Sequence, residues 1–149
     1  MSSFPEMHRE EHQPGDCPFC SIVEGKMTSV VAAQTVKALA IISLEGHPLV
    51  IPKAHVTEHD LDLGSPEALA AVDLALRLVP AVRHAYDALG INLIMNFGEA
   101  SGQEIPHLHI HLIPRFERDN DGQLSFHPKK HPRGLALQRA QAIATYHNS

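Results

Sequence analysis

The feature that most restricts the fold of this chain is a seven-residue run in which three histidines alternate with apolar residues. Successive side chains of a β-strand point to opposite faces of a sheet, so a strand over residues 107–113 would separate the two kinds of residue completely. We therefore predict a strand that presents three imidazoles on one face and anchors a hydrophobic core with the other. The imidazole face comprises His107, His109 and His111, and the core face comprises Leu108, Ile110 and Leu112.

Apolar periodicity predicts one long helix and several further strands around this run. Ser65 is a suitable N-cap and Pro66 a suitable first helical residue, and the apolar pattern continues at helical spacing to Gly90. Pro80 lies inside this pattern and is expected to kink or divide the helix, because it lacks a backbone N–H. Further strands are predicted within residues 30–42, 49–51 and 91–97, with a loop over 98–106. Strands that bracket a central helix favour an α+β domain built on an antiparallel sheet.

Length and composition favour one globular domain. The chain has 149 residues, of which 44% are hydrophobic and 19% charged, so it can bury one sizeable core. We expect a flexible arm over residues 1–15, the domain over 16–120, and a C-terminal tail over 121–149 that can hold a short helix.

Charge and hydropathy exclude two classes of partner. The net charge of −5 leaves no broad basic surface for duplex nucleic acid. No run approaches the roughly 18 consecutive apolar residues of a membrane span. The N-terminus is acidic where a signal peptide would need an apolar core, so a cytoplasmic location is expected.

Aligned imidazoles are compatible with several kinds of chemistry. Near neutral pH an imidazole can act as a nucleophile, a hydrogen-bond donor or a metal ligand. On this pattern alone, a purely metal-binding strand and three solvent-facing histidines remain alternatives. The two cysteines of the chain, Cys17 and Cys20, form a C-x-x-C pair. Such a pair fits a disulfide, a redox motif or, with two further ligands, a tetrahedral zinc site.

Three segments in the same order resemble the histidine triad (HIT) family. The run from His107 to Ile113 is similar to that family's signature His-φ-His-φ-His-φ-φ, in which φ is apolar, and it continues into Pro114 and Arg115. Residues 96–103 are similar to its N-x-G-x-x-x-G-Q loop, and residues 46–55 to its G-H-x-L-V-I-P-K-x-H segment. The resemblance implies a HIT-like fold, an antiparallel sheet with a central kinked helix, a nucleotide substrate and a homodimer.

The resemblance also implies a mechanism. The middle histidine, His109, would attack the α-phosphorus of a nucleotide to form a nucleotidyl-histidine intermediate, which water then hydrolyses. A backbone carbonyl of the same strand would hold the other ring nitrogen of His109. His111 and His47 match positions near the phosphate oxygens, where they would stabilise developing charge. The implied nucleotide-binding positions are Asn96, Gly102, Gln103, His111 and Ser43, while Ile22 and Leu39 are candidates for either a base pocket or the core.

Zinc-containing branches of the family pair two cysteines with two histidines. The positions that match in this chain are Cys17, Cys20, His55 and His107. The resemblance therefore implies a structural zinc ion that ties the N-terminal turn to the catalytic strand, and it assigns His107 to the metal. His59 is the nearest substitute ligand, and reduced thiols without metal are the alternative.

Two departures from the family pattern bear on the substrate. Only Ser43–Gly46 separate the strand that ends near Ile42 from His47, so the Asp or Asn that grips the ribose is missing and Ser43 takes its place. Glu104 stands where phosphoramidase members carry a small hydroxyl residue, and the Pro114-Arg115 ending occurs in members that cleave dinucleoside polyphosphates. The resemblance thus favours hydrolysis at the α-phosphate of a dinucleoside polyphosphate or similar nucleotide. The alternatives are a nucleotide-binding or interaction protein with little turnover, a nucleoside phosphoramidase, and a metal-dependent hydrolase.

Overall fold

Five antiparallel strands form one sheet in the computed structural model of this protein, which describes residues 16–117 and 130–149. The predicted arm over residues 1–15 lies outside these described residues. Across the sheet the strands follow the order β1, β2, β3, β5, β4, so β1 and β4 are its edges. Their bounds are β1 (Val30–Gln34), β2 (Ala38–Ile42), β3 (Pro48–Pro52), β4 (Gly90–Met95) and β5 (Ile110–Arg115). The predicted α+β class and the antiparallel sheet are confirmed.

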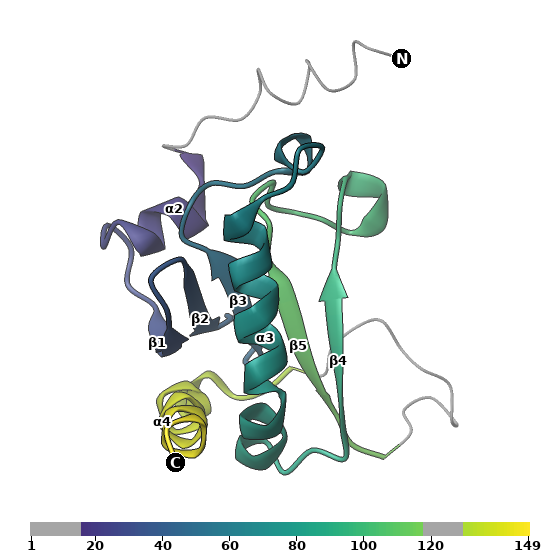
Figure 1. Cartoon of the computed structure of the whole chain (residues 1–149). Helices are drawn as coiled ribbons and strands as arrows, with labels where there is room; N and C mark the ends of the chain where they lie inside the picture. Colours follow the sequence, from purple (N-terminus) through teal and green to yellow (C-terminus); the bar gives the residue numbers. More distant parts are fainter. Residues whose placement is uncertain (1–15, 118–129) are drawn as a thin grey trace.

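Helix α3 (Pro66–Ala85) covers one face of the sheet and lies across β3 and β5 (Figure 1). It begins as predicted, because the Ser65 hydroxyl accepts a hydrogen bond from the backbone N–H of Ala68 at 3.0 Å. The helix continues through Pro80 without being divided. Its buried side packs on the sheet through Ala68, Ala71, Leu74, Ala75, Leu78, Ala81 and Val82.

The predicted end of this helix at Gly90 is wrong by several residues. Helix α3 ends at Ala85, because Asp87 adopts a positive φ of 50° and turns the chain out of the helix. The backbone N–H of Leu89 then donates to the Arg115 carbonyl at 2.8 Å, which aligns β4 with β5. Leu89, which the helical pattern included, is 62% exposed. Pairing of the segment after α3 with β5 therefore ends the helix earlier than the apolar periodicity predicts.

Strand β5 begins at Ile110, three residues later than predicted. Before it, the backbone N–H of Leu108 donates to the Val56 carbonyl at 2.7 Å, so this part of the chain is held by a loop and not by a neighbouring strand. The predicted separation of faces is still confirmed. Leu108, Ile110 and Leu112 all belong to the core beneath α3, whereas the rings of His107 and His109 contact Phe19 of a separate cluster.

A second, smaller core lies on the opposite face of the sheet. Leu49 of β3 is paired with His111 of β5, so its side chain points to the same face as the His111 ring. The short helix α2 (Pro18–Val23) covers part of this face. Leu39 is buried in this core and Ile22 packs against it, which supports the core assignment for both residues. The members of the cluster are Cys17, Phe19, Cys20, Leu39, Ile41, Leu49 and Ile51.

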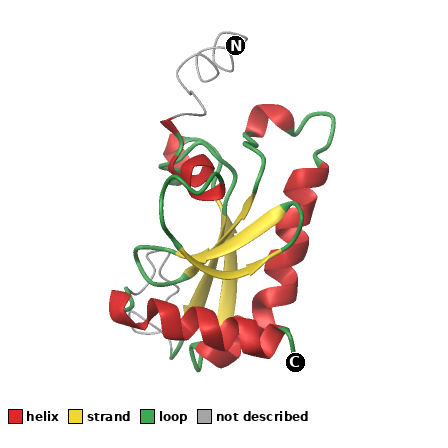
Figure 2. Cartoon of the chain, turned by 90° about the vertical axis from the view of Figure 1, so that its left-hand side faces the viewer, coloured by secondary structure: helices red, strands yellow, loops and turns green. Residues whose placement is uncertain are grey.

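The C-terminal segment is part of the folded domain. Its helix α4 (Ala136–His147) packs against α3 and β1, and its Ala140 and Ile143 belong to the main core. In Figure 2, α4 ends at the C label and runs across the lower end of the sheet toward the lower end of α3. Ahead of the helix, the backbone N–H of His131 donates to the Glu45 carbonyl at 2.8 Å. Within the described residues, none of the helices combines the length and apolar character needed to cross a lipid bilayer.

Two glycines with similar backbone angles are expected to respond differently to substitution by alanine. Gly46 has φ +95° and Gly64 has φ +83°, so either alanine would cost roughly 1–2 kcal/mol in backbone strain. A Cβ at Gly46 would also lie 2.6 Å from the His131 Cβ, whereas at Gly64 no described atom lies within 4 Å. We expect Gly46→Ala to lower the free energy of unfolding by about 1–3 kcal/mol more than Gly64→Ala does. Urea unfolding of both variants measures this, and equal losses would contradict the contact between Gly46 and His131.

Candidate active site and metal site

The three alternating histidines have three different partners. The His107 ring faces the two cysteines, with its Nδ1 3.4 Å from the Cys17 Sγ. The Nδ1 of His109 lies 2.7 Å from the carbonyl oxygen of His107, and the Nδ1 of His111 lies 2.9 Å from the Nε2 of His47. Because each ring has its own partner, the described residues do not present the triad as a common set of ligands for one catalytic metal.

The geometry around His109 defines its protonation state. A carbonyl oxygen can only accept, so the Nδ1 of His109 carries the proton and donates it to His107. The Nε2 of His109 then holds a lone pair. Burial lowers the pKa of His109, and this effect exceeds the opposing influences of the carbonyl hydrogen bond and of Glu104. The ring is therefore neutral near pH 7, with Nε2 available as a nucleophile. The side chain is 7% exposed and packs against the Phe19 ring at a centroid distance of 5.1 Å.

His47 and His111 form a pair of neutral rings. Burial lowers the pKa of His47 to about 3, with a further contribution from the nearby His111. Burial, followed by the nearby His109, lowers the pKa of His111 to about 4. The Nδ1 of His47 is buried, and no hydrogen-bond partner for it lies within residues 16–117 and 130–149. A bare acceptor is tolerated there better than an orphaned N–H, so we assign the shared proton to the Nε2 of His47. The Nε2 of His111 then carries a proton that can be donated to a ligand.

The folded protein is expected to lose stability as the pH falls below about 6.5. The pKa values of His47 and His111 are lower in the folded chain than the ordinary 6.5, so the unfolded chain binds more protons between about pH 6.5 and 4. The free energy of unfolding should then fall by up to about 1.4 kcal/mol per pH unit for each histidine. Urea unfolding at pH 7.5 and 5.5 tests this, with His47→Gln as the comparison. Any loss of metal affects both proteins, so equal slopes would exclude a contribution from His47.

The loop after β4 is closed by its own side chains and glycines. The Oε1 of Gln103 accepts a hydrogen bond from the backbone N–H of Gly98 at 2.9 Å. Gly98 and Gly102 have φ values of +85° and +100°, which glycine adopts without strain. Gln103 therefore helps to close the loop, as does Ser101, whose hydroxyl donates to the Gly98 carbonyl at 2.7 Å. The predicted contact of Gln103 with phosphate stays a prediction. Asn96 follows directly after the last residue of β4 and is half-buried.

Ser43 has a more enclosed position than its predicted ribose-binding role requires. Its hydroxyl oxygen is buried, and the described part of the chain offers it no hydrogen-bond partner. Its backbone N–H donates to the His47 carbonyl at 2.8 Å, which closes the short turn between β2 and β3. The role of Ser43 in ribose binding stays a prediction.

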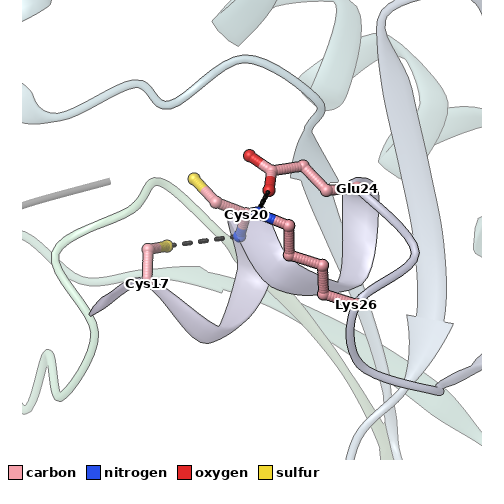
Figure 3. Close-up of polar contacts among 4 residues, drawn as sticks. All are labelled: Cys17, Cys20, Glu24 and Lys26. Carbon is pink, nitrogen blue, oxygen red and sulfur yellow. Dashed lines mark hydrogen bonds and ion pairs between the residues drawn. The ribbon is translucent and has the colours of Figure 1, made fainter. Parts of the chain in front are cut away.

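Four predicted ligands meet in one cluster. The donor atoms of Cys17, Cys20, His55 and His107 all lie within 4.8 Å of one another, and His59 is not among them. Both cysteines are free thiols at the start of α2, where the Cys17 Sγ accepts from the backbone N–H of Cys20 (Figure 3). The predicted juxtaposition of residues nearly 90 positions apart in the sequence is therefore present in the fold.

The dimensions of this cluster fit a tetrahedral zinc ion. Zinc bonds of about 2.3 Å to sulfur and about 2.0–2.1 Å to nitrogen separate neighbouring ligand atoms by roughly 3.3–3.8 Å. The Cys20 Sγ lies 3.2 Å from the Nδ1 of His55 and 3.5 Å from the Nδ1 of His107. The Nε2 of His107 lies 3.0 Å from the Pro52 carbonyl, to which it can only donate, so the Nδ1 of His107 presents its lone pair to the cluster. The residues present fit the metal in number, type and tautomer.

Sequence patterns did not single out every residue around the site. Phe19 packs against the rings of both His107 and His109. Its position between Cys17 and Cys20 is the sequence feature that could have indicated a place near the site. Tyr86 lies within the apolar pattern that predicts α3, and this pattern assigns it no role at the site. Its hydroxyl instead donates to the carbonyl of Gly46, the residue before His47. No local pattern encodes that contact, because the two residues are 40 positions apart.

Comparisons of the sequence and of the structure with known proteins point to the same family. The sequence profile described as the HIT domain matches residues 26–118. An adenylylsulfatase from Arabidopsis thaliana is 37% identical over 109 residues, which cover 70% of this chain and 54% of that protein. An adenosine 5'-monophosphoramidase from Schizosaccharomyces pombe is 36% identical over 104 residues, which cover 66% of this chain and 74% of that protein. Among solved structures, a zinc-bound histidine triad family protein from Mycobacterium smegmatis has a TM-score of 0.71 and 29% identity, covering 91% of this chain and 96% of its own.

Proposed function

Because this chain belongs to the HIT family, we propose that it hydrolyses a nucleotide at the α-phosphate through a covalent bond to His109. The observation that carries the proposal is the 2.7 Å contact between the Nδ1 of His109 and the His107 carbonyl, which leaves Nε2 as an unprotonated nucleophile. Burial of the ring keeps it neutral near pH 7. The names of two relatives, an adenylylsulfatase and an adenosine 5'-monophosphoramidase, support an adenylyl compound as substrate.

The proposed reaction has two displacements at phosphorus. In the first, the lone pair of the His109 Nε2 forms a bond to the α-phosphorus, and the leaving group departs with the electrons of its former bond to phosphorus. In the second, water attacks the same phosphorus, and the P–N bond breaks to return its electrons to Nε2. The proton that water gives up balances, through the solvent, the proton taken up by the departed leaving group. The products are a nucleoside monophosphate and a regenerated imidazole. In this proposal His111 carries a proton on Nε2 and donates it in a hydrogen bond to the phosphate oxygens, which the 2.9 Å contact of its Nδ1 with the His47 Nε2 supports.

The experiment that tests this function is incubation with three adenylyl compounds followed by intact-protein mass spectrometry. Diadenosine polyphosphate, adenylyl sulfate and adenosine 5'-phosphoramidate present leaving groups of different charge on the same α-phosphate. The expected result is release of AMP from at least one compound and a protein species heavier by one adenylyl group. Tight binding of AMP without release or adduct formation would instead support the alternative function, a nucleotide-binding protein with little turnover.

Dinucleoside polyphosphates remain our first substrate class, with nucleoside phosphoramidates second. The Pro114-Arg115 ending favours the first class, and Glu104 in place of a small hydroxyl residue disfavours the second. The two relatives with named activities support leaving groups other than a nucleotide. The relative values of kcat/KM for the three compounds decide between the classes.

The cysteine and histidine cluster is proposed to hold a structural zinc ion. Its ligands would be Cys17, Cys20, His55 and His107, whose donor atoms lie within 4.8 Å of one another. The zinc-bound family member from Mycobacterium smegmatis supports this choice of metal. A four-ligand site has no open position for substrate, so the metal would contribute stability and orientation, and the residues that act on phosphate would be His109, His111 and His47.

A homodimer in the cytoplasm is proposed as the form in which the protein works. Strand β4 is an edge of the sheet, and α3 carries the exposed side chains of Leu69 and Leu76. An unpaired strand edge and exposed apolar side chains each favour pairing with a second copy. The two free thiols are compatible with a reducing compartment. Light scattering coupled to size exclusion measures the mass of the particle, and a monomer at micromolar concentration would contradict the dimer.

A further inference from the structure

The turn that carries His47 is short and is held from outside. Within it, the backbone N–H of Gly46 donates to the Ser43 carbonyl at 2.9 Å, and that of Ser43 donates to the His47 carbonyl at 2.8 Å. Two other carbonyl groups of the turn accept hydrogen bonds from distant parts of the chain, one from the end of α3 and one from the segment before α4. The position of His47 therefore depends on more than its own hairpin.

Tyr86 supplies the first of these external contacts. Its side chain is 4% exposed, and its hydroxyl donates to the Gly46 carbonyl, directly before His47 in the chain. The guanidinium of Arg139 lies 4.3 Å from the centre of the Tyr86 ring, and the His131 ring contacts it edge-on at 5.2 Å. Burial raises the pKa of Tyr86 to about 12, so the hydroxyl keeps the proton that it donates. The tyrosine ring is thus contacted by two residues of the C-terminal segment.

His131 supplies the second contact. Its backbone N–H donates to the Glu45 carbonyl at 2.8 Å. The missing side chain of Gly46 makes this approach feasible, since a Cβ there would lie 2.6 Å from the His131 Cβ and 2.7 Å from the His131 carbonyl oxygen. Two adjacent carbonyl groups of the turn are therefore fixed from outside: that of Glu45 by His131 of the C-terminal segment, and that of Gly46 by Tyr86, which packs against this segment. Residues 130–149 lie outside the part of the chain that matches the HIT domain.

We propose that Tyr86 is a positioning residue that sets the His47 ring against His111 through the carbonyl of Gly46, with the segment from His131 to Arg139 holding Tyr86 in place. The His47 Nε2 lies 2.9 Å from the His111 Nδ1, so a small displacement of the turn would weaken this hydrogen bond and the tautomer that it enforces. A proton on the Nε2 of His111 is what the proposed phosphate contact needs. The effect on rate rests on the proposed function, whereas the effect on the two rings does not.

The test uses Tyr86→Phe, which removes the hydroxyl and keeps the ring that contacts Arg139 and His131. Tyr146→Phe is the matched control, because it is the only other tyrosine and is 43% exposed on α4. For the adenylyl compound that the native protein cleaves best, we expect Tyr86→Phe to lower kcat about 10-fold with KM within about twofold. The ring nitrogens of His47 and His111 are followed by nitrogen NMR, which distinguishes the two tautomers. Their resonances should shift in Tyr86→Phe and stay in place in Tyr146→Phe.

A double-mutant comparison shows whether Tyr86 acts through His47. If it does, adding Tyr86→Phe to a His47→Ala protein should change kcat by less than about twofold. The same loss in both backgrounds would overturn the proposal, as would unchanged His47 and His111 resonances in a folded Tyr86→Phe protein. If the native protein cleaves none of the adenylyl compounds, the proposed function fails. The resonances of the two rings still decide the positioning role in that case.

Discussion

Replacing His109 with alanine is expected to lower kcat by at least about 10³-fold while nucleotide affinity stays within about threefold of the native value. The substitution removes the nitrogen that forms the covalent bond. It leaves His47 and His111, whose 2.9 Å contact does not involve the His109 ring. Single-turnover kinetics measures the chemical step, and calorimetric titration with AMP measures the affinity. The adenylyl adduct should be absent from the mass spectrum of the variant.

The matched control for this substitution is His84→Ala. His84 is an exposed histidine near the end of α3, where its ring stacks on that of Tyr146. It should retain the native kcat and the native adduct. An adduct of native yield in His109→Ala would mean that another residue is the nucleophile. An inactive His84→Ala protein would mean that the loss in either variant reflects folding and not chemistry.

Removal of the metal is expected to have the second large effect, and on stability more than on chemistry. Structural zinc contributes apparent binding free energies of about 10–16 kcal/mol in small zinc-dependent domains, and this larger domain has two hydrophobic cores besides. We expect Cys17→Ala combined with Cys20→Ala to cost at least about 4 kcal/mol, which lowers the Tm by roughly 10 °C for a chain of this size. Elemental analysis should find one zinc per native chain and none in this variant.

His59→Ala is the control for the metal site. His59 lies in the short turn Glu58–Asp60, near His55 in sequence but outside the four-residue cluster. It should keep one zinc per chain and a Tm close to that of the native protein. Zinc lost from His59→Ala, or a native protein that purifies without metal and keeps its Tm in strong chelator, would contradict the proposed ligand set. Turnover that persists in the chelator would separately exclude a metal-dependent hydrolase.

Much of this fold follows from local pattern. Alternation placed Leu108, Ile110 and Leu112 in the core, and the serine and proline at 65 and 66 marked the start of α3. Both signals act over a few residues, through strand pleating and through capping. The end of α3 did not follow from pattern, since it is decided by the pairing of Leu89 with Arg115, and β5 begins later than alternation predicts because Val56 holds Leu108.

The candidate site likewise has some features that could be predicted from the sequence and others that could not. The resemblance to the family brought Cys17, Cys20, His55 and His107 together correctly, although no spacing rule connects them. It also anticipated the carbonyl that holds His109. It could not indicate that Gln103 bonds to its own loop, which depends on the conformation of residues 98–103. Nor could it indicate that Tyr86 reaches Gly46, because that contact depends on how the end of α3 packs against this chain's short turn.

The separation of the metal ligands along the chain has a consequence for how the protein folds. Cys17 and His107 are 90 residues apart, so a metal shared by them closes a loop that includes β1 to β4 and all of α3. Closing so long a loop costs conformational entropy before any contact can offset that cost. We therefore expect this link to form only after most of the chain has folded. Zinc would then act late in folding, and it would slow the opening of the finished domain more than it speeds its formation. The C-x-x-C turn would therefore bind its metal in the last steps of folding and release it in the first steps of unfolding.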